Sequence, residues 1–299
     1  MDRIELRNDR PSDRDASTAS PPSRPRRFFA HPLVWMPIGV LAIAAAAAIC
    51  SILGSTLGPA GAIGGGLLSA ALTIAIYRTG VHRLAGRATP ELPFAWRRAG
   101  IRALAGAGVG AGFMVVSVTL VVLLGGYTLA WHPLDPVVTV AAAITVSLGA
   151  AVVEELIFRG LVFRAIEQLA GRRVVLGRVL ALGLTSIFFG VAHLLNPAAT
   201  LWSGLAIAIE AGFLLGAAFL WTRSLWFVIG LHTAWNAIEG MLGIAVSGHR
   251  DPGLFVTTTH GPALLTGGEF GLDASLVPVL VSLAIAIPML VASARRASR

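Results

Sequence analysis

The sequence predicts an all-α, polytopic integral membrane protein. Of its 299 residues, 56% are hydrophobic and 13% are charged, and the mean hydropathy is +0.78. A soluble domain carries roughly twice that share of charged residues. Apolar windows of about 20 residues, each long enough to cross a bilayer as a helix, recur along the chain. Together these observations exclude an ordinary soluble domain.

We predict about eight transmembrane helices, with a core bundle formed by helices four to seven. The windows are residues 33–57, 60–77, 103–126, 137–158, 174–195, 201–221, 225–246 and 274–292. Residues 1–30 mix Arg, Asp, Ser and Pro with few apolar side chains, which predicts a disordered cytoplasmic tail. Residues 31–299 are predicted to form one transmembrane domain, in which residues 137–246 carry the motifs described below.

The arginines predict the orientation of the chain in the membrane. All 23 basic residues are arginines, and 22 of them fall on one side if the eight helices alternate. The positive-inside rule then places both termini in the cytoplasm. A basic set without lysine indicates a GC-rich coding bias, from which we expect the inner membrane of a bacterial cell. The net charge of +8 is thus a topology signal, and we expect no nucleic-acid partner.

Two carboxylates and an arginine lie near the end of the fourth window. A titratable group inside a membrane costs several kcal/mol, so it usually has a partner and a function. Glu155 and Arg159 are four residues apart and can form an ion pair on one helix face, whereas Glu154 lies about 100° around the helix. This segment is equally consistent with a structural cluster at the membrane surface, in which Arg159 and Arg164 pair with the carboxylates.

Further polar groups lie in the fifth, sixth and seventh windows. His193 follows Phe189 by one helical turn, and taken alone it is typical of a core histidine bonded to a backbone carbonyl. His232 and Asn236 share a helix face, so they form either part of a site or a structural hydrogen-bonded pair. Glu210 lies in the middle of the sixth window, where its cost predicts that it lines a cavity or pairs with an arginine.

These groups together suit the hydrolysis of a carbonyl compound by water. A carboxylate can remove a proton from water with help from an imidazole, and a second imidazole with an amide can stabilise the oxyanion. We find no Ser or Cys in a recognisable nucleophile setting, which favours direct attack by water. An equally admissible arrangement makes Glu154, His193 and His232 ligands of a catalytic Zn²⁺. Since no HExxH motif supports zinc, we expect no cofactor and keep zinc as the second choice.

Three short motifs resemble those of a known family. EELIFR (154–159), FGVAH (189–193) and HTAWN (232–236) resemble the EExxxR, FxxxH and HxxxN motifs of the CPBP family. That family includes CAAX prenyl endopeptidases and the Abi proteins, which process bacteriocins or confer immunity to them. The resemblance covers roughly residues 137–246 and implies an eight-helix intramembrane protease.

The resemblance also implies a role for each motif residue. Glu154 would activate water with help from His193, and His232 with Asn236 would form the oxyanion site. Glu155 and Arg159 would support Glu154. Outside these catalytic roles, we expect Phe189, Glu210 and Glu239 to contact substrate.

The predicted function is therefore a glutamate-type intramembrane endopeptidase. Its expected partners are membrane lipid and a membrane-associated peptide or protein, with or without a lipid modification. The alternative is a non-catalytic scaffold or immunity protein that binds a peptide at the same place. One feature opposes a common site: the predicted windows put Glu154 and His193 near opposite membrane faces. The residues can meet if the fourth helix continues past Arg159 or the fifth is strongly tilted.

Overall fold

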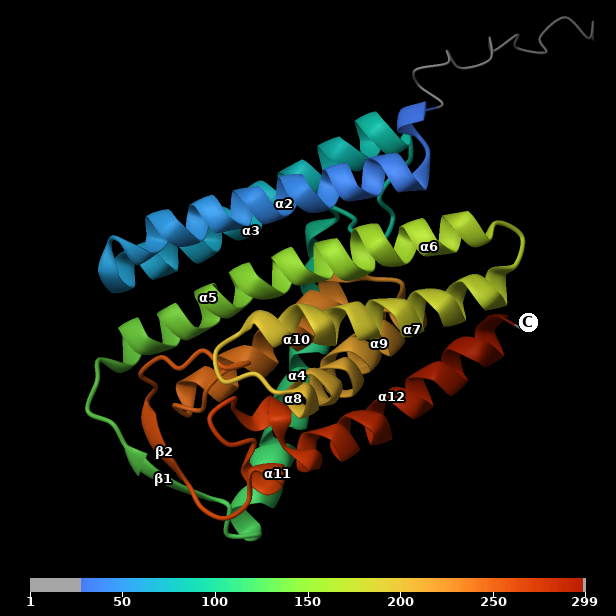
Figure 1. The fold of residues 1–299 in the computed structure, drawn as a ribbon. Helices are drawn as coiled ribbons and strands as arrows, with labels where there is room; N and C mark the ends of the chain where they lie inside the picture. The colour runs from blue at the N-terminus through green and yellow to red at the C-terminus, as the bar shows by residue number, and fades with distance from the viewer. Residues whose placement is uncertain (1–27, 298–299) are drawn as a thin grey trace, which may run out of the picture.

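The computed structural model describes residues 28–297, which form a bundle of long helices and one small sheet (Figure 1). The hairpin of α2 (Pro32–Ser55) and α3 (Gly58–Gly80) covers one side and packs against α5 (Pro136–Glu155). The other helices are α4 (Trp96–Leu123), α6 (Phe163–Ala170), α7 (Val174–Ala192), α8 (Leu201–Ile207), α9 (Leu214–Thr222), α10 (Leu225–Met241), α11 (Ala263–Thr266) and α12 (Leu276–Ala297). The first 27 residues of the predicted disordered tail lie outside the described residues.

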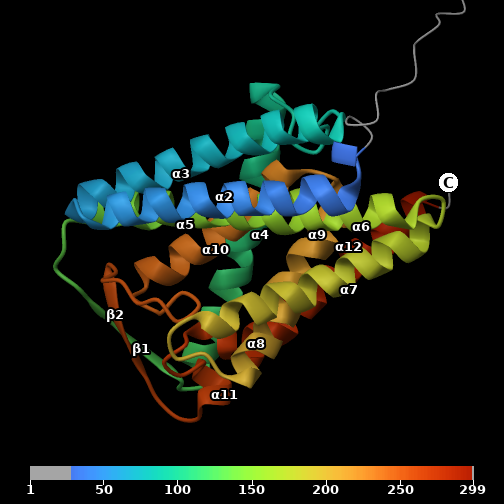
Figure 2. The ribbon, with the colours of Figure 1, turned by 45° about the horizontal axis from the view of Figure 1, so that its top comes forward.

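Within residues 28–297, seven helices are long and apolar enough to cross a membrane. This confirms the prediction of an all-α polytopic membrane protein. The predicted seventh span, residues 225–246, is instead the 17-residue helix α10. Most of its side chains are buried because α4 and α5 pack around it. The start of α2 and the end of α12 lie at the same end of the bundle (Figures 1 and 2).

A two-stranded sheet closes the opposite end of the bundle (Figure 1) and departs from the all-helical prediction. Strand β1 (Tyr127–Trp131) pairs antiparallel with β2 (Phe255–Thr259), with Tyr127 opposite Thr259. The hydroxyl of Tyr127 also donates to the carbonyl of Thr266 at 2.5 Å. These bonds join the segment after α4 to the segment after α10. Hydrophobic windows alone do not reveal strands of five residues.

Glycines let α4 and α10 approach until their backbones touch. A Cβ on Gly106 or Gly110 would collide with carbonyl groups of α10, and one on Gly230 would collide with the carbonyl of Ala103. Small residues allow close helix packing in lipid, and Gly106, Gly110 and Gly230 do so at this interface. This contact places α4, the third predicted span, in the core of the bundle. It also fixes the position of the part of α10 that carries His232.

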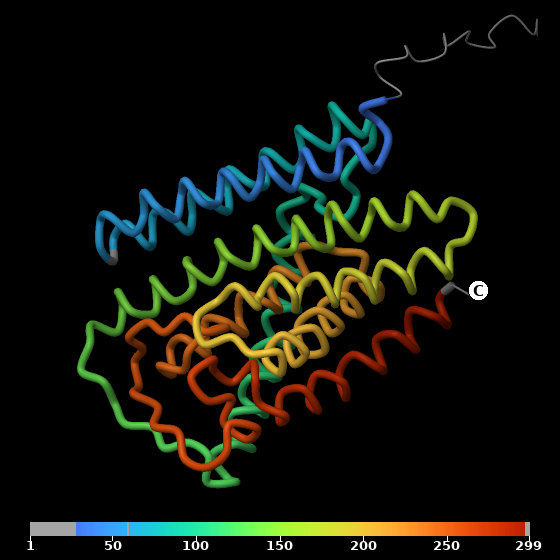
Figure 3. The backbone as a smooth tube through the Cα atoms, in the orientation of Figure 1, coloured from blue at the N-terminus to red at the C-terminus, as the bar shows by residue number. Residues whose placement is uncertain are grey.

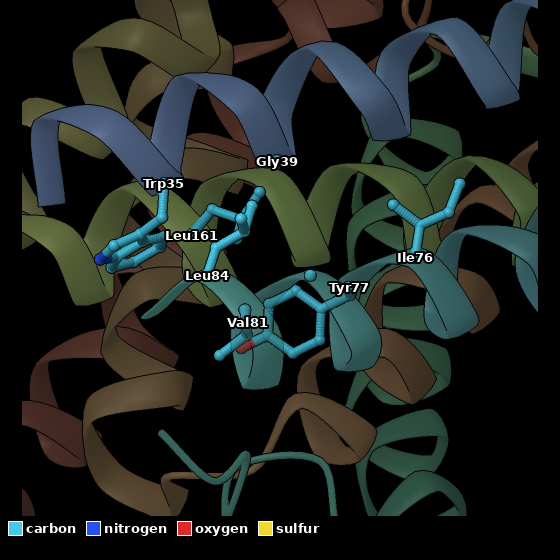
Figure 4. A pocket seen from close by; sticks show the side chains of 8 residues that line it. Trp35, Gly39, Ile76, Tyr77, Val81, Leu84 and Leu161 are labelled. Atoms are coloured by element: carbon cyan, nitrogen blue, oxygen red, sulfur yellow. The ribbon is translucent and has the colours of Figure 1, made fainter. Parts of the chain in front are cut away.

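The α2–α3 hairpin lies alongside α5 and the helical segment that continues it, as the backbone tube shows (Figure 3), and aromatic side chains anchor it there. Figure 4 shows a small cavity where Trp35 of α2, Tyr77 of α3 and Leu161 converge. The ring of Tyr77 lies over Gly160, and its hydroxyl donates to Glu91 Oε1 at 2.5 Å. The hairpin therefore braces the long helix directly beyond Arg159.

Candidate active site

One continuous helical segment carries the first motif. Helix α5, the π-helical segment Leu156–Val162 and α6 form a single span, Pro136–Ala170, of 35 residues. At 1.5 Å per residue it is about 52 Å long, so Glu154 lies near its middle. The fourth helix thus continues past Arg159, which is the first of the two arrangements that allow Glu154 and His193 to meet. The predicted end at residue 158 is wrong because the arginine-containing turn beyond it is helical and partly buried.

Glu155 and Arg159 form the buried ion pair that their spacing predicts. Arg159 Nη1 donates to Glu155 Oε1 at 3.0 Å, and neither side chain is exposed to solvent. Arg159 Nη2 donates to the carbonyls of Ala211 and Gly212, each at 3.0 Å. Those carbonyls belong to a second π-helical segment, Ala208–Phe213. A π-helical turn leaves carbonyls without their usual partners, and such turns are frequent at functional sites.

His232 joins both glutamates across the bundle. Its Nδ1 lies 3.0 Å from Glu155 Oε1, and its Nε2 lies 3.8 Å from Glu154 Oε2. Because a carboxylate only accepts, an ionised Glu155 requires the proton on Nδ1 and thereby orients the ring. Glu154 keeps 27% of its side chain exposed, whereas that of Glu155 is fully buried. Glu154 is therefore the more exposed of the two carboxylates, although its Oε2, which faces His232, is buried.

Phe189 connects His193 to this cluster. Its ring stacks on His193 at 4.7 Å between centroids and lies 6.2 Å from the ring of His232. The guanidinium of Arg159 lies over the same ring at 4.8 Å. His193 Nδ1 lies 2.7 Å from the carbonyl of Phe189, as expected for a core histidine. Since a carbonyl only accepts, a neutral His193 carries its proton on Nδ1 and leaves Nε2 as an acceptor.

Asn236 lies one turn beyond His232 on α10 and is partly exposed. In the described part of the chain its side chain makes no hydrogen bond. The structural alternative, a bonded His232–Asn236 pair, is therefore not what the structure contains. The amide is free to donate to a bound molecule.

Glu210 and Glu239, expected to contact substrate, lie elsewhere. Both are fully buried, and the charged groups that act on Glu210 are the carboxylates of Asp273 and Glu239. Glu239 Oε1 accepts from the backbone N–H of Leu272 at 3.0 Å, whereas neither oxygen of Glu210 has a hydrogen-bond partner. The substrate role of these two glutamates remains a prediction. Arg164, considered above as a partner of the motif carboxylates, instead pairs with Glu167 at 2.8 Å.

Sequence reasoning missed two residues next to this site. Trp235 lies with its ring 6.1 Å from His232, and its Nε1 donates to Asp273 Oδ1 at 3.2 Å. Asp273 also accepts from the backbone N–H and the hydroxyl of Ser247. The signal that could have identified Asp273 was its position directly before the last apolar window (274–292), since a carboxylate buried there requires partners.

The arrangement of the His, Cys, Asp and Glu side chains bears on the zinc alternative. Within residues 28–297, no group of three or more His, Cys, Asp or Glu side chains is arranged to hold a metal ion. The zinc alternative therefore depends on a rearrangement of Glu154, His193 and His232. It remains the second choice and is tested by chelation below.

Comparison with known proteins gives one match. Residues 136–238 match the family model described as type II CAAX prenyl endopeptidase Rce1-like, which covers about a third of the chain and all three motifs. No curated protein and no solved structure matches the chain. The resemblance to the CPBP family is thereby confirmed over this segment. The matched family is one of endopeptidases, and the match together with the seven apolar helices indicates a multi-pass membrane protein.

Proposed function

We propose that this protein is an intramembrane endopeptidase that hydrolyses a peptide bond with water activated by Glu154. Its substrate would be a membrane-associated or lipidated peptide or protein. The observation that carries the proposal is the chain of contacts from Arg159 through Glu155 to His232 and on to Glu154. Glu155, whose charge is compensated by Arg159, orients the imidazole of His232. This imidazole lies beside Glu154, whose side chain is 27% exposed.

The two glutamates have different environments and hence different proposed roles. Glu155 is occupied on Oε1 by Arg159 and His232, so it acts as a positioning residue. Glu154 makes no hydrogen bond through Oε2 and faces His232 only at 3.8 Å. At that separation the two groups do not hydrogen-bond to each other, so both remain available to a water molecule or a substrate atom. Two carboxylates whose environments differ in this way typically have different roles in a reaction.

The proposed reaction is a direct addition of water. Glu154, assisted by the free Nε2 of His193, takes a proton from water while the water oxygen attacks the carbonyl carbon. The carbonyl oxygen becomes an oxyanion that accepts from the Asn236 amide and from a protonated His232 Nε2. Collapse of the intermediate breaks the C–N bond, and the proton held by Glu154 passes to the departing nitrogen. The products are a carboxylate and an amine.

We also propose a location and an orientation. The start of α2 and the end of α12 share one end of the bundle (Figure 1), and the turn between α6 and α7 lies there too. This turn includes Arg172 and Arg173, and Arg295 and Arg296 lie near the end of α12. Positive residues favour the cytoplasmic side, which supports an orientation with both termini in the cytoplasm. The inner membrane of a bacterium is proposed from the lysine-free composition.

The test is cleavage of a panel of fluorogenic, lipid-modified peptides by the purified protein in detergent. Glu154→Gln is compared with the parent, and Glu269→Gln, an exposed carboxylate outside the site, is the matched control. Each protein is assayed with and without a chelator, after a thermal unfolding curve has shown that it is folded.

The proposal expects cleavage that survives chelation and the control change but disappears in Glu154→Gln. Cleavage that is unaffected by Glu154→Gln contradicts the proposed mechanism. Loss on chelation, with rescue by Zn²⁺, moves the zinc alternative to first place. Peptide binding without turnover by the folded parent favours the scaffold or immunity alternative.

A further inference from the structure

A basic cavity lies at the end of the bundle where α6 turns into α7, apart from the candidate active site. It has a volume of about 360 Å³. Its lining consists of Arg87, Arg164, Glu167, Gln168, Gly171, Val174, Arg178 and Arg223. Four guanidinium groups therefore surround a space that only one carboxylate shares. Nothing in the proposed cleavage reaction uses these residues.

The internal ion pairs leave the cavity with an excess of positive charge. Glu167 accepts from Arg164 and from both terminal nitrogens of Arg223, each at 2.8 Å. Arg87 pairs with Glu91 at 2.8 Å. Counting both carboxylates, two positive charges in the cluster are uncompensated.

Arg178 is the arginine without a partner. In the described part of the chain it makes no ion pair or hydrogen bond, and its Nε is buried. The Nε of Arg164 is buried and unbonded as well. Buried N–H donors of charged groups normally have acceptors, because a buried donor without a hydrogen bond costs free energy. Guanidinium groups match phosphate oxygens in geometry and charge, so an anion with several oxygens would satisfy both residues.

The surroundings of the cavity indicate an amphiphile. Val174 lines the cavity and is 52% exposed, and Val175 and Val179 of the same helix are exposed by 73% and 62%. These valines lie in the first turns of α7, which runs from the α6–α7 turn along the bundle (Figures 1 and 2). A phospholipid could place its phosphate among the arginines and its acyl chains on these valines. Basic pockets between membrane helices commonly bind anionic lipid headgroups.

The distance to the candidate active site argues against a direct role in cleavage. Arg164, the cavity residue nearest to Glu154 on the same helical span, lies 10 residues beyond it, which corresponds to about 15 Å. An anion in the cavity therefore cannot contact the bond that Glu154 would attack.

We propose that this cavity binds the phosphate of an anionic phospholipid headgroup. The lipid would tie α6 and α7 to Arg223, which ends α9 directly before the N-cap of α10, Ser224. Binding there would stabilise the junction of α6, α7 and the start of α10, which belong to the three helical segments that carry the motifs. The proposal does not depend on proteolysis, so it stands or fails separately from the proposed function.

The test is lipid binding by the purified full chain in neutral detergent, read by native mass spectrometry and by the shift in melting temperature. The probes are phosphatidylglycerol, phosphatidylcholine, inorganic phosphate and an acidic peptide. The variant is Arg178→Gln, because removing an unpaired arginine breaks no internal ion pair. The matched control is Arg172→Gln, an exposed arginine of the same turn that does not line the cavity.

We expect phosphatidylglycerol to bind and to raise the melting temperature, with about fivefold weaker binding by Arg178→Gln and unchanged binding by Arg172→Gln. Equal weakening by both changes would indicate unspecific surface charge and overturn the proposal. Equal binding of phosphatidylcholine would overturn it too. Binding of inorganic phosphate alone would make the site one for a soluble anion, and binding of the acidic peptide alone would make it a protein-binding site. Either result contradicts a lipid site.

Discussion

His232 and Glu155 lie 77 residues apart in the sequence, yet His232 Nδ1 and Glu155 Oε1 are 3.0 Å apart inside the bundle. The same Glu155 oxygen accepts from Arg159, so one carboxylate links the first motif to the third. Three charged or chargeable groups thus share one buried contact point. In a low-dielectric interior, such a network is stable only while every member is present.

Replacing Glu155 with glutamine should therefore damage both stability and activity. The change leaves the fully buried Arg159 without a counter-charge, which costs about 3–5 kcal/mol in unfolding free energy. It also releases His232, and a misplacement of about 1 Å lowers kcat by about 10²-fold. Thermal unfolding and peptide cleavage measure the two effects.

A double change separates these two effects. Glu155→Leu combined with Arg159→Leu removes both charges, so most of the lost stability should return while cleavage stays low. Recovery of cleavage in the double variant would show that Glu155 does not position His232. Equal instability of the double and single variants would contradict the ion-pair explanation.

Phe189 should be required for the placement of both histidines. Its ring contacts His193, His232 and the guanidinium of Arg159, so Phe189→Leu should lower stability by about 1–3 kcal/mol and reduce kcat more than it changes KM. The neighbouring Phe188 is 51% exposed, and Phe188→Leu is the matched control. A similar effect of the two changes on kcat would argue against the specific role of Phe189.

The contact between α4 and α10 should not tolerate a methyl group. A Cβ at Gly110 would collide with the backbone of Leu231, whereas one at Gly108 meets nothing within 4 Å. We expect Gly110→Ala to destabilise the protein by about 1–3 kcal/mol. Gly108→Ala should have no effect or stabilise the helix by up to about 1 kcal/mol. Melting temperatures of the two variants in detergent decide this, and equal values would contradict the close backbone contact.

Replacing Glu210 with glutamine should lower neither stability nor substrate binding. It is fully buried, its neighbouring charges are Asp273 and Glu239, and neither of its oxygens has a partner. We therefore expect Glu210→Gln to unfold no more readily than the parent and to leave KM within about twofold, since glutamine keeps the shape of the side chain and carries no charge in this buried, acidic environment. A clearly raised KM at an unchanged melting temperature would instead support the substrate contact predicted from the sequence.

Much of the site could be anticipated from local spacing. The Glu155–Arg159 pair follows from a separation of four residues on a helix, and the closeness of Phe189 to His193 follows from the same rule. The partner of His232 did not follow from spacing, because helix periodicity says nothing about which faces of different helices meet. Asp273 escaped attention for the same reason, since its partners Trp235 and Ser247 lie far away in the sequence.

The sequence by itself determined that the chain is a helical membrane protein, where its apolar segments lie and which residues carry the motifs. These properties depend on composition and on the period of the helix, both of which are local. Only the tertiary structure decided that the fourth span continues to Ala170, that α10 packs against α4, and that Glu155 and His232 share a contact. Helix ends and helix neighbours depend on which buried groups satisfy one another, and these groups come from separate parts of the chain. Arg159 illustrates this: its spacing identified Glu155 as a partner, but only the fold supplied the carbonyls of Ala211 and Gly212 that keep it buried.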